Sequence, residues 1–131
     1  MENPSAGKSA IGLDGNVTAL IGYIIGIVAL VLIFIEKDNK FVRFHAIQSV
    51  LWSAGCTVAI IVVAIVGTIF TLILAQVSSA LGGIFGLLFT IVYLAVFLGW
   101  IGGLIFGAIK SYGGAIFKLP IVGNFAEKWA N

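Results

Sequence analysis

Three long apolar stretches without a charged residue dominate the sequence. They cover residues 17–35, 51–74 and 84–109, and none of them contains Asp, Glu, Lys or Arg. A helix needs about 20 apolar residues, at about 1.5 Å each, to cross a hydrocarbon core of about 30 Å. With 61% hydrophobic and 9% charged residues, the chain has more apolar side chains than a globule of 131 residues can bury. We therefore predict an all-α integral membrane protein with three transmembrane helices.

The second stretch is rich in valine, isoleucine and threonine, a composition that in water is typical of β-strands. In lipid, a peptide group without a hydrogen-bond partner is so costly that a spanning segment must be helical. We therefore predict a helix over residues 51–74. One alternative stays open, in which residues 46–75 form two short re-entrant helices instead of one span.

The ends of the apolar stretches are marked by a polar N-terminal segment and an uncharged connector. Residues 1–16 are small and polar, without apolar periodicity, so we predict a flexible tail there. Residues 17–131 then form a single membrane domain. The connector at 75–83 contains small and polar residues but no charge, which is typical of a turn near the far membrane surface.

Two further segments combine charged and aromatic residues, as is typical of the membrane interface. In residues 36–50, two phenylalanines and a glutamine recur at helical spacing beside five charged residues, which predicts an interfacial amphipathic helix before the second span. In residues 111–131, Gly113 and Gly114 should end the third helix, and Pro120 could open a short new one. This C-terminal part is predicted to be a second interfacial segment.

Basic residues are distributed unevenly around the three predicted spans. Only Lys8 precedes the first span, while six lie in the first loop or the C-terminal region: Lys37, Lys40, Arg43, Lys110, Lys118 and Lys128. Because Lys and Arg concentrate on the cytoplasmic side, we predict an outside N-terminus and a cytoplasmic C-terminus. Ten residues are predicted to contact the interface and its anionic headgroups: Lys37, Lys40, Phe41, Arg43, Phe44, His45, Gln48, Lys118, Pro120 and Trp129.

Small residues repeat every four positions along the third stretch. The row consists of Ala95, Gly99, Gly103 and Gly107, and Gly22 and Gly26 repeat the same spacing in the first stretch. Such rows let helices approach closely and gain van der Waals contact in lipid, where the hydrophobic effect contributes nothing. Two interpretations stay open, namely packing within one chain and association with a second copy.

The sequence offers little material for catalysis or for binding a cofactor. No ionisable Asp, Glu, Lys or Arg lies within the apolar stretches, His45 is the sole histidine, and Cys56 is the sole cysteine. A metal site, a proton relay and a disulfide all need partners that these residues lack. No basic run interleaves with aromatic residues as in a nucleic-acid surface. We therefore expect no enzyme activity, no cofactor and no nucleic-acid partner, although His45 could titrate near neutral pH.

Two segments carry a resemblance to a known family: residues 35–49, IEKDNKFVRFHAIQS, and residues 117–123, FKLPIVG. Over residues 16–128 the chain resembles the Tic-twenty-like small membrane proteins of bacteria and archaea. That group is related to the chloroplast inner-envelope import component and to magnetosome membrane protein F. The resemblance implies a multi-pass protein in the cell membrane of a bacterium or archaeon. Its chloroplast relatives serve in a protein-conducting complex, and its magnetosome relatives act in membrane organisation and crystal maturation.

These observations lead to two functional hypotheses. The first is a non-enzymatic scaffold or accessory subunit of a membrane assembly. Its partners would be the lipid bilayer and either further copies of the chain or a larger membrane complex. The second is a component of a protein-translocation or small-solute transport pore. Measurement of flux through the reconstituted protein separates them, because a scaffold conducts nothing.

Overall fold

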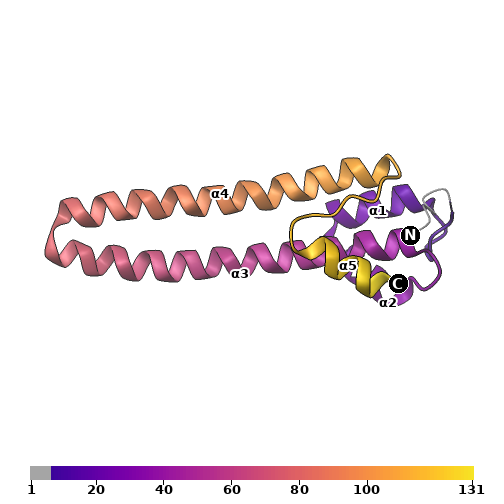
Figure 1. The fold of residues 1–131 in the computed structure, drawn as a ribbon, viewed down its shortest axis with the longest axis horizontal. Helices are drawn as coiled ribbons and strands as arrows, with labels where there is room; N and C mark the ends of the chain where they lie inside the picture. Colours follow the sequence, from indigo (N-terminus) through magenta and orange to yellow (C-terminus); the bar gives the residue numbers. More distant parts are fainter. Residues whose placement is uncertain (1–6) are drawn as a thin grey trace. The chain divides into compact units, whose positions relative to one another are not determined.

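The computed structural model describes residues 7–131. These residues form five helices, in the order α1 (Gly15–Ile24), α2 (Gly26–Ile35), α3 (Lys40–Val77), α4 (Ser79–Tyr112) and α5 (Val122–Ala130) (Figure 1). No β-strand occurs among them, so the predicted all-α class is confirmed. The chain divides into two compact units where we expected one domain. Unit 1 comprises the residues up to Ser53 together with Gly102–Asn131, and unit 2 is Ala54–Ile101.

The first predicted span, over residues 17–35, is not one helix. Ile25 adopts an extended conformation (φ −115°, ψ 92°) that separates α1 from α2. The two helices pack against each other, and a Cβ placed on Gly22 would lie 3.6 Å from the Ala29 Cβ. Each helix has 10 residues and is therefore about 15 Å long. Of the helices described, α3 and α4 are long and apolar enough to cross a membrane, so the structure has two such helices rather than the predicted three.

The break brings the two ends of the apolar segment together. The Ala10 amide donates a 2.7 Å hydrogen bond to Glu36 Oε2, although 26 positions separate them. The hydroxyl oxygens of Ser9 and Thr18 lie 2.7 Å apart, so this part of the N-terminal segment is an ordered turn rather than the predicted tail. The rest of that predicted tail, residues 1–6, lies outside the described residues.

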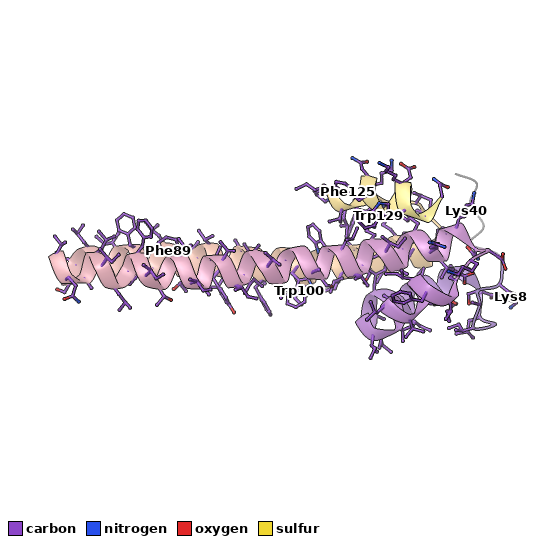
Figure 2. The ribbon with its side chains drawn as sticks, turned by 90° about the horizontal axis from the view of Figure 1, so that it is seen from below. Lys8, Lys40, Phe89, Trp100, Phe125 and Trp129 are labelled. Carbon is purple, nitrogen blue, oxygen red and sulfur yellow. The ribbon has the colours of Figure 1, made fainter. Side chains whose placement is uncertain are left out.

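The first turns of α3 form the centre of unit 1. Every side chain at positions 41–49 is buried except that of Arg43, which is partly exposed. One hydrophobic cluster joins this segment to α1 and α2: Ala19, Ala29, Leu32, Phe41, Val42 and Ala46. A second cluster joins it to α5: Phe44, Ile47, Ala126 and Ala130. Figure 2 shows α5 and the α1–α2 pair on different sides of this part of α3. The segment is therefore a core helix and not the predicted interfacial one.

The end of α4 agrees with the predicted break at the glycine pair. The helix ends at Tyr112, and Gly114 has φ +80°, a left-handed conformation that glycine adopts without strain. This turn lets the Ala115 amide donate a 3.0 Å hydrogen bond to the Lys110 carbonyl. Residues 113–121 continue without regular secondary structure, and we call them the strap.

The last helix, α5, packs through its small residues and exposes its aromatic ones. Gly123, Ala126 and Ala130 lie on its buried face. Phe125 and Trp129 are about half exposed, with ring centroids 6.1 Å apart (Figure 2). This outward aromatic pair lies in the C-terminal segment predicted to be interfacial, and such rings favour the headgroup region of a membrane.

Unit 2 is an antiparallel pair formed by the parts of α3 and α4 that lie in Ala54–Ile101. A Cβ on Gly67 would meet the Phe89 side chain at 2.8 Å, and one on Gly82 would meet the Ala75 Cα at 2.8 Å. These glycines let the two helices approach closely. Only Ser78 separates the helices, so the connector is much shorter than the predicted loop at 75–83. Apolar side chains on this pair are largely exposed, as expected of a surface solvated by lipid.

Candidate functional site

A buried polar network lies where α1, α3 and the strap meet in unit 1. His45 and Gln48 project from neighbouring turns of α3, and Tyr23 projects from the last turn of α1. Their side chains are at most 3% exposed. In a low-dielectric interior, polar groups are tolerated only when they are hydrogen bonded. The bonding of each group therefore decides what the network can do.

Gln48 uses both ends of its amide. Its Nε2 donates to the Tyr23 hydroxyl at 2.7 Å and to the Phe117 carbonyl at 2.8 Å. Its Oε1 accepts a 2.9 Å hydrogen bond from the Leu119 amide, 71 positions away in the chain. The bonds to the Phe117 carbonyl and the Leu119 amide pair backbone groups of the strap that have no partner within a helix or strand. Gln48 thus fixes the strap to α3.

The hydrogen bonds also determine the protonation of His45. Its Nε2 lies 3.0 Å from the Ala115 carbonyl, which only accepts, so Nε2 carries a proton and donates. Its Nδ1 lies 3.0 Å from the Tyr23 hydroxyl. The Tyr23 hydroxyl accepts from Gln48 and still has its own proton to donate to Nδ1, so these contacts accommodate a neutral imidazole.

Aromatic rings enclose the same imidazole. The ring centroids of Phe41, Phe44 and Tyr23 lie 4.6, 4.9 and 5.6 Å from that of His45, each in an edge-on arrangement. With both nitrogens bonded and the ring enclosed, no face of His45 is open to a ligand. The network holds elements together and has no free group for acid–base chemistry.

Three glycines make room for the side chains around the network. A Cβ on Gly107 would lie 2.5 Å from Tyr23 Cε1, and one on Gly103 would lie 2.5 Å from Trp52 Cε2. A Cβ on Gly123 would lie 2.7 Å from the Lys118 Cα, which is backbone and cannot move aside. Two members of the predicted small-residue row therefore pack against rings of their own chain.

The structure separates the residues predicted to contact the interface. Phe41, Phe44, His45 and Gln48 are at most 1% exposed, so they lie in the core and not among headgroups. Arg43 is partly exposed, and its Nη1 lies 3.5 Å from the Glu36 carbonyl. The remaining members are exposed: Lys37, Lys40, Lys118, Pro120 and Trp129. Helical spacing identifies one face of a helix correctly, but it does not identify what covers that face.

The predicted helix-packing residues are also divided. Gly22, Gly103 and Gly107 pack within the chain, whereas a Cβ on Gly26 or Gly99 would meet nothing within 4 Å, and Ala95 is exposed. Sequence reasoning missed Gly67, Gly82 and Gly86, although Gly82 and Gly86 repeat the four-residue spacing. Tyr23, within the first predicted span, was not predicted to belong to a polar site. Within residues 7–131, no three His, Cys, Asp or Glu side chains gather in a metal-binding group.

The two segments that carry the family resemblance, at 35–49 and 117–123, meet in this network. The family model described as the magnetosome magnetite crystal formation protein family, MamF/MmsF, matches residues 10–126. The chain belongs to this family. The predicted relation to magnetosome membrane protein F is thereby confirmed, while the wider Tic-twenty grouping stays a prediction.

Archaeal relatives of this MamF/MmsF member are also membrane proteins by name. A UPF0132 membrane protein of Methanocaldococcus jannaschii is 33% identical over 125 residues, covering 95% of this chain and 96% of the relative. A second from the same organism is 29% identical, covering 92% and 73%. One from Archaeoglobus fulgidus is 32% identical, covering 86% and 92%. No solved structure matches the chain. With the exposed apolar helices, these relatives identify a helical membrane protein.

Replacing Tyr23 with phenylalanine tests the network in this MamF/MmsF protein. The change keeps the ring but leaves His45 Nδ1 without its donor and removes one acceptor from Gln48. We expect a loss of about 1–3 kcal/mol in the free energy of unfolding, because a buried polar group is left unpaired. Unfolding in mixed micelles measures it. Tyr93→Phe is the matched control, since Tyr93 is exposed in unit 2; equal stability of the two variants would contradict the network.

Proposed function

We propose that the chain is a non-enzymatic scaffold or accessory subunit of an assembly in the cell membrane. The observation that carries the proposal is the division of the small-residue row on α4. Rings of the same chain occupy the space beside Gly103 and Gly107, whereas the space beside Gly99 is open and Ala95 is exposed. An open Ala–x–x–x–Gly pair is a surface that a second membrane helix can approach closely.

Unit 2 supports this role through the nature of its surface. Large apolar side chains are exposed along both helices, including Val62 on α3 and Leu98 on α4. Lipid tails and a partner helix are equally apolar, so the hydrophobic effect does not favour one over the other against this surface. Close packing at small residues then decides where a partner helix binds. The Ala95–Gly99 pair is where that packing is sterically free.

Unit 1 supports anchoring at one membrane surface. Exposed Lys37, Lys40 and Lys128 would attract anionic headgroups by about 1 kcal/mol each when near the surface, whereas Lys118 is paired with Glu127. Trp129 is exposed next to Lys128 in the sequence and would set the depth of α5. This arrangement suits a protein that organises a membrane region without chemistry of its own.

Native mass spectrometry of the protein in nanodiscs tests the assembly. We expect the wild type to form a defined homo-oligomer or to retain a partner protein, and Gly99→Leu to lose it without loss of folding. The matched control is Gly83→Leu, because Gly83 is also sterically open and lies about 160° around α4 from Gly99. A monomeric wild type, or an assembly unchanged by Gly99→Leu, would overturn assembly through this face.

A second candidate function is a component of a translocation or solute pore. One observation favours it, which is a groove of about 380 Å³ between α3 and α4 in unit 2 with hydroxyl groups in its lining. The hydroxyl-bearing residues are Thr68, Thr71, Thr90 and Tyr93. In an oligomer, such hydroxyls could line a polar path through lipid. Flux of a small solute through reconstituted vesicles would favour this function, and its absence would favour the scaffold.

A further inference from the structure

The apolar segment formed by α1 and α2 is bounded by charged turns that touch each other. No Asp, Glu, Lys or Arg occurs between Asp14 and Glu36. Despite this length, the Ala10 amide reaches Glu36 Oε2 at 2.7 Å. A straight helix over the same residues would hold its ends about 30 Å apart. Two ends in contact with each other would lie on the same side of a membrane.

The C-terminal part of unit 1 is tied to the same end. Asn16 Nδ2 donates a 3.0 Å hydrogen bond to the carbonyl of Tyr112, the last residue of α4. Between Glu36 and Tyr112 the chain passes once along α3 and once back along α4. Two passages return the chain to the side from which it started. The N-terminal turn, the 36–39 loop and the strap thus share one side.

The other end of the α1–α2 pair is apolar and exposed. Ile24, Ile25 and Ile27 are 69%, 48% and 71% exposed, and Gly26 between them adds no polar side chain. Water would not favour three exposed isoleucines at one turn, whereas acyl chains would. Each arm is about 15 Å long, about half of a 30 Å hydrocarbon core. The pair has the length to enter one leaflet and return.

We propose that α1 and α2 form a re-entrant hairpin whose isoleucine turn inserts into the acyl chains of the leaflet that adjoins the basic loops. The N-terminus then lies on the same side as the C-terminus, in place of the outside location predicted for three spans. Irregular backbone at Ile25 is compatible with membrane depth because its amide bonds to the Ile21 carbonyl at 2.8 Å.

The distribution of basic residues favours this topology over three spans. With three spans, six Lys and Arg residues lie on one side and Lys8 lies on the other. With a re-entrant hairpin and two spans, all seven lie on one side, and none lies near the α3–α4 connector. The positive-inside rule is satisfied more completely, and it places both termini in the cytoplasm.

Cysteine labelling in the full-length protein tests the sidedness. On a Cys56→Ala background, Ala10→Cys, Asp38→Cys and Ser79→Cys each place one thiol at an exposed position. A membrane-impermeant maleimide is applied to intact cells and to inverted vesicles. We expect Ala10→Cys and Asp38→Cys to label from the same side and Ser79→Cys from the other. Labelling of Ala10→Cys from the side of Ser79→Cys would show a true span and overturn the proposal.

A depth measurement separates insertion from mere sidedness. On the same background, Ile25→Cys carries an environment-sensitive fluorophore, and lipids with a nitroxide on the acyl chain are the quencher. At position 25 we expect strong quenching by the nitroxide lipids and little quenching by aqueous iodide. At position 38 we expect little quenching by the lipids and strong quenching by iodide. Ile27→Cys repeats the measurement if the first variant folds poorly. Iodide access at both turn positions would overturn insertion even if the sidedness holds.

Discussion

Gly107→Leu is expected to prevent unit 1 from reaching its folded state. A Cβ at this position would already lie 2.5 Å from Tyr23 Cε1 and 2.7 Å from Cζ, and leucine adds three more carbons. The ring cannot move aside without breaking the hydrogen bonds to His45 and Gln48. Overpacking costs about 1–3 kcal/mol, and the lost hydrogen bonds add about 1–3 kcal/mol. The sum of about 2–6 kcal/mol is a large part of a typical domain's stability.

Gly102→Leu is the matched control for this change. Gly102 lies on the same helix and in the same unit, and a Cβ there would meet nothing within 4 Å. We expect its thermal unfolding in detergent, followed by size-exclusion chromatography after heating, to match the wild type. If both leucines lowered the melting temperature equally, the cause would be the loss of glycine rather than the contact with Tyr23.

Gln48→Leu is expected to release the strap from α3. The two side chains have similar volumes, but leucine leaves the Phe117 carbonyl and the Leu119 amide without partners in the core. Each buried unpaired group costs about 1–3 kcal/mol, so the loss is about 2–6 kcal/mol. Because the lost hydrogen bonds all belong to the contact between Gln48 and the strap, we expect the strap and α5 to detach locally before the whole protein unfolds.

Limited proteolysis is the measurement that detects this detachment. Cleavage after Lys118 should be much faster in Gln48→Leu than in the wild type, while α3 and α4 stay protected. Gln76→Leu is the matched control, because Gln76 is exposed near the end of α3 in unit 2. Unchanged protection of Lys118 in Gln48→Leu would mean that apolar contacts alone hold the strap.

The helical class and the positions of the long helices follow from the sequence because they depend on local composition. The apolar runs at 51–74 and 84–109 lie within α3 and α4, and α4 ends just before Gly114, where glycine permits a left-handed turn. The run at 17–35 has the same local composition. Its break at Ile25 places Gly22 close to Ala29 across the turn, and local hydropathy does not encode such a contact between two helices.

The candidate site was predictable only in its parts. Phe41, Phe44 and Gln48 stood out as one helical face, yet apolar and polar residues at that spacing suit an interface and a core equally. What decides between them is the strap, whose Leu119 is 71 positions from Gln48. Similarly, the spacing of Gly103 and Gly107 indicated close packing but not that rings of the same chain fill it. Which distant residues contact each other decides both cases, and a single sequence does not reveal those contacts.

In this MamF/MmsF protein, a buried hydrogen-bond network joins the two segments that carry the family resemblance, one on α3 and one in the strap. Hydrogen–deuterium exchange at the Leu119 amide tests it most directly. This amide lies outside any helix, and Gln48 Oε1 is its acceptor. We expect slow exchange in the wild type and fast exchange in Gln48→Leu. Fast exchange at Leu119 in the wild type, equal to that of an exposed turn, would contradict it.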